Sequence, residues 1–347
     1  MEHVFTHIAL IVILFHGGLE LRFSHLKESA LPAAKVAFGL MALNLAAVAL
    51  LSHAFGQSWE TALLLGIALA PLAATVAIPM LEHLNFSARV GTIITLESAL
   101  GDVVAVVGVL TLSEAFAAGS LEIGQALGKF FSSLLAASLL GLAAAMAWSL
   151  VLGRVQALAK TSFATEAFLL VVAGITGWLG FSGAIGALAF GIGLRNLDHL
   201  LPVSLTTRLN LQPQGLTDTE TALLGEAVFI LKIFFFVYLG ILLRLNHLPT
   251  VGMALLLTAT LLVIRQAFFC IQANLAPDPR ERHMAASMVS KGLATAVVAV
   301  VPLELGLLGG SWIRDVAYAV IPISILATAL GIAFQRKGPK EEEVPVP

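Results

Sequence analysis

The sequence predicts an all-α protein that crosses a membrane many times, and three observations support this fold class. First, 59% of the 347 residues are hydrophobic and 12% are charged, whereas soluble domains carry about 25% charged residues. Second, the mean hydropathy is +0.96, and it comes from repeated apolar runs of about 20 residues, the length of a membrane-spanning helix. Third, the sequence lacks the alternating segments of about ten residues that a membrane β-barrel needs.

The apolar runs predict about eleven transmembrane helices. In chain order the predicted spans cover residues 3–20, 30–55, 60–81, 88–115, 127–152, 163–181, 183–200, 222–243, 249–272, 284–303 and 312–335. Residues 1–335 therefore form one predicted transmembrane domain, and residues 336–347 form a short polar tail.

Basic residues in the connections predict the orientation of the spans, because cytoplasmic connections carry an excess of lysine and arginine. One alternating set of connections contains Arg22, Lys27, Arg89, Arg154, Lys160, Arg195, Arg208, Arg280 and Arg282, and the tail adds Arg336, Lys337 and Lys340. The other set contains little beyond Arg244 and Arg314. We therefore expect the first set and the C-terminus in the cytoplasm, and Met1 outside.

Composition and missing motifs narrow the function classes. The net charge of −2 gives no basis for a nucleic-acid partner. The single cysteine, Cys270, excludes an internal disulfide and a CxxC metal site. The zinc-protease motif His-Glu-x-x-His is absent. A membrane aspartyl protease would need a second aspartate within a span, but the other aspartates, Asp198, Asp218, Asp278 and Asp315, fall in predicted loops or at span ends. We therefore expect no enzymatic activity.

Two of the predicted spans contain the residues of interrupted helices. Span 60–81 contains Gly66, Pro71 and Pro79, and span 284–303 contains Gly292 and Pro302. Each is the middle member of a three-span group, 30–115 or 249–335, and the two groups enter the membrane from opposite sides. Such a pair predicts an inverted-repeat secondary transporter with its site between the breaks. The alternative for either span alone is close packing of small residues.

Asp102 is the strongest candidate for a functional residue. It lies within the apolar span 88–115, and a carboxylate near the bilayer midplane costs roughly 2.5–3.5 kcal/mol on insertion scales. Ser98 lies one helical turn before it on nearly the same face, and Glu97 lies next to Ser98. Two acids and a hydroxyl in one membrane helix can hold a small cation or a proton, so we expect Asp102 to bind a monovalent cation.

Four further residues are candidates with open alternatives. Lys232 lies mid-span, where a charge needs a partner, although a lysine near a span end would extend to water. Arg265 lies nearer a cytoplasmic end, which favours such extension or carbonyl bonding. His16 is either a group that titrates near neutrality or a hydrogen-bonded core histidine. Thr75 can offer an oxygen to an ion or bond back to its own helix.

Several stretches, taken in order, resemble the sodium/proton exchanger (monovalent cation:proton antiporter) superfamily. They are Leu14-Phe15-His16-Gly17-Gly18-Leu19-Glu20-Leu21, Glu97-Ser98-Ala99-Leu100-Gly101-Asp102, Phe181-Ser182-Gly183-Ala184-Ile185-Gly186-Ala187-Leu188-Ala189, Phe234-Phe235-Phe236-Val237-Tyr238-Leu239-Gly240 and Ser290-Lys291-Gly292-Leu293-Ala294. The resemblance implies a dimeric antiporter with a scaffold domain, a mobile core domain and two broken helices that cross beside the ion site.

The resemblance also implies roles for single residues. Asp102 matches the aspartate that binds the ion and the proton. Glu97 and Ser98 match a Glu-Ser pair whose glutamate commonly bonds a basic residue on the second broken helix, so an ion pair between Glu97 and Lys291 is expected. Lys232 falls on the span where electrogenic members carry a basic residue.

This sequence also departs from the pattern of that superfamily. Gly101 stands where Asn or Asp is usual, and Leu72-Ala73-Ala74 stands where Thr-Asp-Pro is frequent. His16 stands where many members have an acid. Members with thirteen spans have two more before the first one here, so we expect an N-terminal piece to be missing. The tail is too short for a nucleotide-binding domain, so no cofactor is implied.

The sequence therefore predicts an antiporter that exchanges Na⁺ or K⁺ for H⁺, with Asp102 as the carrier. We expect a homodimer in the lipid bilayer of a prokaryotic inner (plasma) membrane. Two alternatives remain open at this point. One is a transporter of the same architecture that moves an organic anion with a cation, and the other is a degenerate membrane subunit that transports nothing.

Overall fold

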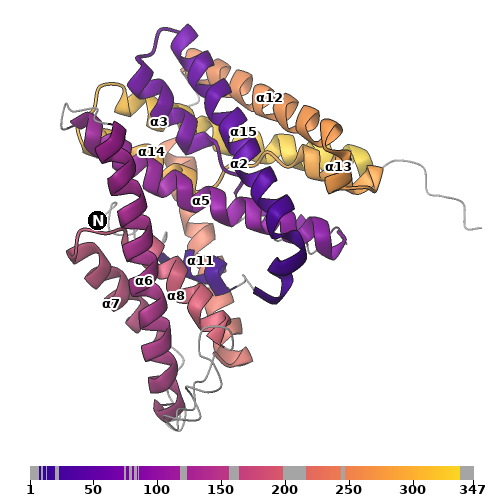
Figure 1. Ribbon diagram of the computed structural model, residues 1–347. Helices are drawn as coiled ribbons and strands as arrows, with labels where there is room; N and C mark the ends of the chain where they lie inside the picture. Colours follow the sequence, from indigo (N-terminus) through magenta and orange to yellow (C-terminus); the bar gives the residue numbers. More distant parts are fainter. Residues whose placement is uncertain are drawn as a thin grey trace, which may run out of the picture.

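The described part of the chain is helical throughout. The computed structural model describes residues 8, 11–12, 14–19, 23–73, 76–77, 80–81, 84, 86–117, 123–155, 164–197, 216–243 and 247–336. Every regular element within these residues is a helix, which confirms the predicted all-α class (Figure 1).

Six helices are long and apolar enough to cross a membrane. They cover Pro32–Ala54, Ala88–Ala117, Phe131–Leu152, Glu220–Leu242, Leu248–Ile271 and Gly310–Phe334. Shorter apolar helices cover Trp59–Leu69, Ala164–Trp178, Gly183–Arg195 and Leu293–Glu304. These helices confirm a polytopic membrane protein, while the count of eleven spans stays a prediction.

Two groups of helices surround the interrupted segments. The N-terminal group contains α2 (Phe23–Ala54), α3 (Trp59–Leu69) and α5 (Ala88–Ala117). The C-terminal group contains α12 (Leu248–Ile271), the short 3₁₀ turn η1 (Ala273–Leu275), α13 (Pro279–Ser287), α14 (Leu293–Glu304) and α15 (Gly310–Arg336). In both groups, two long helices flank an interrupted one. The predicted three-span groups 30–115 and 249–335 follow the same order, and the inverted relation between them stays a prediction.

The two groups pack into one another. Helix α14 contacts α3 and α5, α12 contacts α2, and α15 contacts α3. The largest apolar core lies at this meeting, and it includes Leu65 of α3, Val106 of α5, Val298 of α14 and Val320 of α15. Small side chains let membrane helices approach closely, and Gly66 shows this: a Cβ there would lie 2.9 Å from Leu45 O of α2.

A middle bundle lies beside these groups, to the lower left in Figure 1. It contains α6 (Ile123–Val155), α7 (Ala164–Trp178) and α8 (Gly183–Arg195), and α6 also contacts α5. Its core is aromatic, since the Trp148 and Phe168 rings stack with their centroids 4.3 Å apart. Helix α11 (Asp218–Leu242) contributes Leu224 to this core and Leu239 to the largest one.

The first interruption follows α3, which ends at Leu69. Pro71 has no backbone N–H, so it cannot continue the helical hydrogen-bond ladder. The second interruption separates α13 from α14 and covers residues 288–292, with Met288 and Gly292 in extended conformations. Both predicted interruptions are therefore confirmed, but some of the residues from which they were predicted do not lie at a break. Gly66 lies inside α3, Pro302 lies inside α14, and Pro79 lies outside the described residues.

Candidate ion-binding site

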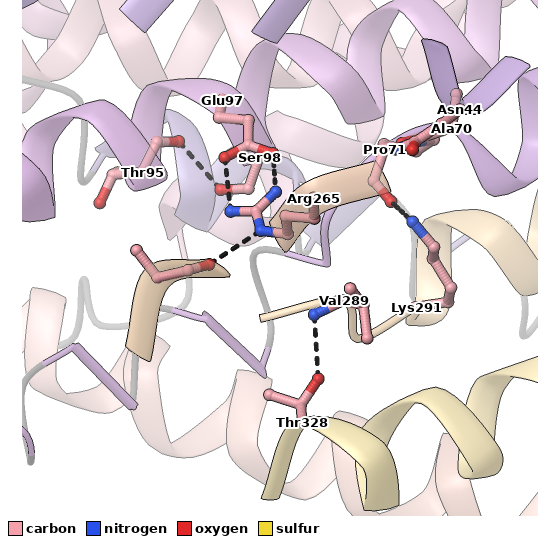
Figure 2. Close-up of polar contacts among 11 residues, drawn as sticks. Asn44, Ala70, Pro71, Thr95, Glu97, Ser98, Arg265, Val289, Lys291 and Thr328 are labelled. Carbon is pink, nitrogen blue, oxygen red and sulfur yellow. Dashed lines mark hydrogen bonds and ion pairs between the residues drawn. The ribbon is translucent and has the colours of Figure 1, made fainter. Parts of the chain in front are cut away.

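The two interruptions lie against each other. The backbone N–H of Ala73 donates to Ser290 O at 3.0 Å, which joins the two non-helical segments directly. The Nζ of Lys291 donates to Pro71 O at 2.6 Å, as Figure 2 shows. Lys291 is 2% exposed, so its positive charge lies in the interior and points at a carbonyl freed by the end of α3.

Side chains from neighbouring helices satisfy the other backbone groups that the interruptions free. Asn44 Nδ2 on α2 donates to Ala70 O at 3.0 Å. On α15, Thr328 Oγ1 accepts from Val289 N at 3.0 Å, and Ser324 Oγ accepts from Lys291 N at 2.9 Å. A buried backbone group without a partner costs free energy comparable to a lost hydrogen bond, so these contacts make the interruptions stable inside the protein.

Glu97 forms an ion pair with Arg265, and this corrects the expected pair with Lys291. Two nitrogens of the Arg265 guanidinium bond the two carboxylate oxygens of Glu97 at 2.5 and 2.9 Å (Figure 2). The planar guanidinium matches a carboxylate at two points, which a lysine cannot do. Arg265 Nε also donates to Ala285 O of α13 at 2.8 Å, and this bond fixes the guanidinium in place.

Of the two expectations for the Arg265 side chain, the structure confirms one and contradicts the other. Carbonyl bonding was one expectation, and the bond to Ala285 O confirms it. Extension to the cytoplasmic surface was the other, and it is wrong because the Arg265 side chain is 4% exposed. The side chain turns inward because Glu97 and Ala285 O together offer three acceptor atoms there.

Asp102 lies on α5 beside these contacts and is 7% exposed. Within the described part of the chain, no group donates a hydrogen bond to its carboxylate, but it interacts electrostatically with Lys291. Ser98, one turn earlier, is fully buried and donates its hydroxyl to Thr95 O at 2.9 Å. This donation leaves the lone pairs of the Ser98 oxygen free to face a cation.

The four buried charges of the site balance one another. Glu97 and Asp102 contribute two negative charges, and Arg265 and Lys291 contribute two positive ones. Lys291 interacts electrostatically with all three of the others. Because Arg265 is held by Glu97, the Asp102 carboxylate is the acid of the site without an ion pair among the described residues.

Gly101 is the residue that lets α5 approach the first interruption. A Cβ at this position would lie 2.8 Å from Pro71 Cβ and 3.3 Å from Pro71 Cα, closer than side chains pack. Asn or Asp, expected here from the resemblance, would collide with Pro71. The close approach of the two backbones therefore requires glycine at position 101.

The remaining candidate site residues either lie elsewhere in the protein or fall outside the residues that the structure describes. Thr75 and the side chain of Lys232 lie outside the described residues. His16 is half-buried and faces α11, where a Cβ on Gly225 would lie 3.9 Å from its Nε2.

Sequence reasoning missed the residues that complete the interruptions, namely Asn44, Ser324, Thr328 and the carbonyl of Pro71. A signal for three of them was present, because each is a polar side chain inside an apolar run. Such residues need a partner in the membrane interior, although the sequence alone does not say which.

Paired interrupted helices beside a buried carboxylate are a pattern that many secondary transporters share. Comparison with known proteins gives the family. The family model described as "Sodium/hydrogen exchanger, transmembrane" matches residues 2–336. The chain belongs to this family.

Curated relatives match almost the whole chain. A K⁺/H⁺ antiporter NhaP2 of Shewanella oneidensis is 23% identical over 355 residues, which cover 99% of this chain and 59% of the relative. The NhaP2 of Shewanella sp. strain ANA-3 is 22% identical over 358 residues, with the same coverage. The chain thus spans about three-fifths of the length of these relatives.

Solved structures share the fold. The sodium proton antiporter MjNhaP1 of Methanocaldococcus jannaschii, solved at pH 8, matches with a TM-score of 0.70 and 16% identity, over 96% of this chain and 84% of that one. A second structure of MjNhaP1, from electron microscopy, matches with a TM-score of 0.64 and 18% identity, over 95% and 80% of the two chains. The likeness confirms the fold class expected from the sequence.

Proposed function

We propose that this protein exchanges a monovalent cation, Na⁺ or K⁺, for H⁺ across the membrane by alternating access, with Asp102 as the carrier. One observation carries the proposal. The Asp102 carboxylate is buried beside the meeting of two interrupted helices, and no group in the described part of the chain donates a hydrogen bond to it. A buried carboxylate without a donor needs a cation or a proton.

The exchange follows from competition at one group. A cation bound to the carboxylate excludes the proton, and a proton on the carboxylate removes the charge that holds the cation. If only the loaded site changes the side it faces, each ion is carried against the other without any covalent step. Ser98 Oγ is the first additional oxygen for the cation, because it lies one turn from Asp102 on the same helix.

The names of similar proteins support the ions proposed. The relatives are called K⁺/H⁺ antiporters, and the protein of the solved structures is called a sodium proton antiporter. These names favour cation/proton exchange over co-transport of an organic anion or a subunit that transports nothing. They favour neither Na⁺ nor K⁺. We further propose a homodimer in a prokaryotic plasma membrane with its C-terminus in the cytoplasm, and a cycle that needs no cofactor.

The test is cation-induced proton movement in proteoliposomes. Wild-type protein, Asp102→Asn and Glu114→Gln are reconstituted, and a pH dye reports the response to Na⁺, K⁺ and Li⁺ in turn. Glu114 is the control because it is an exposed acid on the same helix, α5. We expect responses from wild type and Glu114→Gln and none from Asp102→Asn. A full response from Asp102→Asn would refute Asp102 as the carrier.

A further inference from the structure

A glutamate side chain in the C-terminal group of helices accepts hydrogen bonds from the residue that precedes α5. Glu281 lies in α13, and Ser87 immediately precedes α5. The backbone N–H of Ser87 donates to Glu281 Oε1 at 2.6 Å, and its hydroxyl donates to Oε2 at 2.8 Å. Both oxygens of one carboxylate are therefore engaged by one residue of the other group.

The first turn of helix α5 supplies no carboxylate of its own. It instead carries Arg89, whose charge is unfavourable at a helix N-terminus. The first backbone N–H groups of a helix have no partner within it. Ser87 Oγ accepts from Val90 N at only 3.5 Å, so Glu281 supplies the main polar contact at this end.

Glu281 lies in the first turn of its own helix, α13, but it does not form the cap of that helix. Helix α13 is capped by Asp278, whose carboxylate accepts from Arg280 N at 2.9 Å. The Glu281 carboxylate is thus directed across the boundary between the two groups.

Ser87 leads along the continuous helix α5 to Asp102, and Glu281 leads along α13 to the non-helical segment that contains Lys291. Asp102 lies fifteen residues after Ser87 on the continuous helix α5, about 22 Å along its axis. Lys291 lies ten residues after Glu281, beyond the end of α13. The contact therefore sets the axial position of the helix that carries Asp102 against the segment that carries Lys291.

The contact between Ser87 and Glu281 is exposed to solvent, as is the bond from Arg89 Nη2 to Asn274 O, whereas the contacts at the ion site are not. The Glu97–Arg265 pair and the bond from Lys291 to Pro71 O are buried, so changing them places a charge in the interior. Ser87 is exposed. A substitution there can alter the alignment of α5 without burying a charge.

We propose that Glu281 is a positioning residue for Asp102, and that its contact with Ser87 aligns the ion site. The inference rests on the proposed antiport function. Asp102 is the proposed ligand of the cation, so a shift of α5 caused by loss of the contact should weaken the apparent affinity for the cation more than it lowers the maximal rate.

The experiment exchanges the side-chain donor and acceptor of the contact between Ser87 and Glu281. Ser87→Asp keeps a preferred capping residue for α5, so the helix still folds, but it places a second carboxylate against Glu281. Ser87→Asp with Glu281→Gln rebuilds a hydrogen bond, because the glutamine amide donates to the new aspartate. The cation concentration for half-maximal proton release is measured in proteoliposomes for wild type, both variants and the control Glu114→Gln.

We expect roughly a tenfold higher half-maximal concentration for Ser87→Asp, which corresponds to about 1.4 kcal/mol of binding free energy. At least half of this shift, on a logarithmic scale, should be reversed in the double variant. Thermal unfolding in detergent verifies that both variants fold. A wild-type value for Ser87→Asp, or a double variant no better than the single one, refutes the inference. Absence of proton release from wild type refutes the proposed antiport instead, so the two failures are distinguishable.

Discussion

At the scale of single residues, the structure of the site depends on which group each basic side chain contacts. Arg265 satisfies both oxygens of Glu97 and a backbone carbonyl, whereas Lys291 bonds the carbonyl of Pro71 and faces Asp102 at longer range. Removal of one partner from a buried ion pair leaves the other charge uncompensated. The two bases should therefore differ in what their loss does to the protein.

Arg265→Met should be more destabilising than Lys291→Met. The arginine variant leaves the Glu97 carboxylate buried without a partner, at a cost of about 3–5 kcal/mol. Lys291→Met removes one bond to a carbonyl and should lower the transport rate more than the stability. Thermal unfolding of the purified variants measures the difference. Glu97→Gln with Arg265→Met should recover part of the lost stability, and failure to do so would contradict the pairing.

Gly101→Ala should destabilise the protein by about 1–3 kcal/mol, the typical cost of adding a methyl group to a packed interior. The new Cβ would lie 2.8 Å from Pro71 Cβ. Gly91→Ala is the matched control, since it lies on the same helix with nothing within 4 Å of a Cβ. The control should match or exceed wild-type stability, because alanine favours helix. Equal unfolding temperatures for the two variants would refute close packing at Gly101.

The sequence indicated which residues of the site are unusual but not which of them meet. A buried acid is recognisable from the apolar residues around it, so Asp102 and Glu97 could be predicted. The partner of Glu97 is 168 residues away. Spacing along a helix fixes the face of a residue, but it carries no information about the rotation of a distant helix. Resemblance favoured Lys291 as the partner, and the position of Arg265 decided otherwise.

At the scale of elements, an interrupted membrane helix persists because neighbouring helices supply its missing hydrogen bonds. The second interruption depends on α15, where Thr328 and Ser324 accept from Val289 N and Lys291 N. Non-helical backbone is tolerated at membrane depth only when it is buried in protein or lines a cavity. The side chains of α15 are therefore part of the structure of the interruption.

Thr328→Val should destabilise the protein by about 1–3 kcal/mol, because it keeps the shape of the side chain and leaves Val289 N buried without an acceptor. Thr260→Val is the control, since its hydroxyl bonds Leu256 O of its own helix. Urea or thermal unfolding in detergent compares the two variants. The prediction is wrong if Thr328→Val unfolds at the same temperature as the control.

Proline and glycine predicted the interrupted helices but not the residues at which they break. Pro71 lies in a break, as expected, whereas Pro302 lies in the last turn of α14. A proline near a helix end removes a single hydrogen bond, which packing offsets. Gly66 remains helical because it provides room for α2. Composition shows that a span is irregular, and tertiary contacts decide where it breaks.

At the scale of the whole molecule, the two groups are joined at three depths. Ser87 meets Glu281 at one end, the interruptions meet in the middle, and Thr61 Oγ1 donates to Leu308 O at 3.2 Å at the other end. The N-terminal group, which carries Asp102, and the C-terminal group, which carries Lys291, are thus joined at several points along their length. Relative motion within the protein is therefore expected between these groups and the middle bundle.

The same geometry predicts the sidedness of labelling. Arg280 and Leu308 are both exposed and lie near opposite ends of the interrupted helices. In a background with the single cysteine replaced (Cys270→Ala), a membrane-impermeant maleimide should label Arg280→Cys in inside-out vesicles and Leu308→Cys in right-side-out vesicles. The excess of basic residues in this set of connections predicts a cytoplasmic location for position 280. The opposite labelling pattern would invert the proposed orientation.

The bond between Lys291 and Pro71 O has an evolutionary consequence. Its acceptor belongs to the main chain, so no codon specifies it and no point mutation deletes it while the interruption persists. Only the lysine can be lost by drift. Revertants of a Lys291 variant should therefore restore a hydrogen-bond donor for Pro71 O, because no substitution can remove the acceptor.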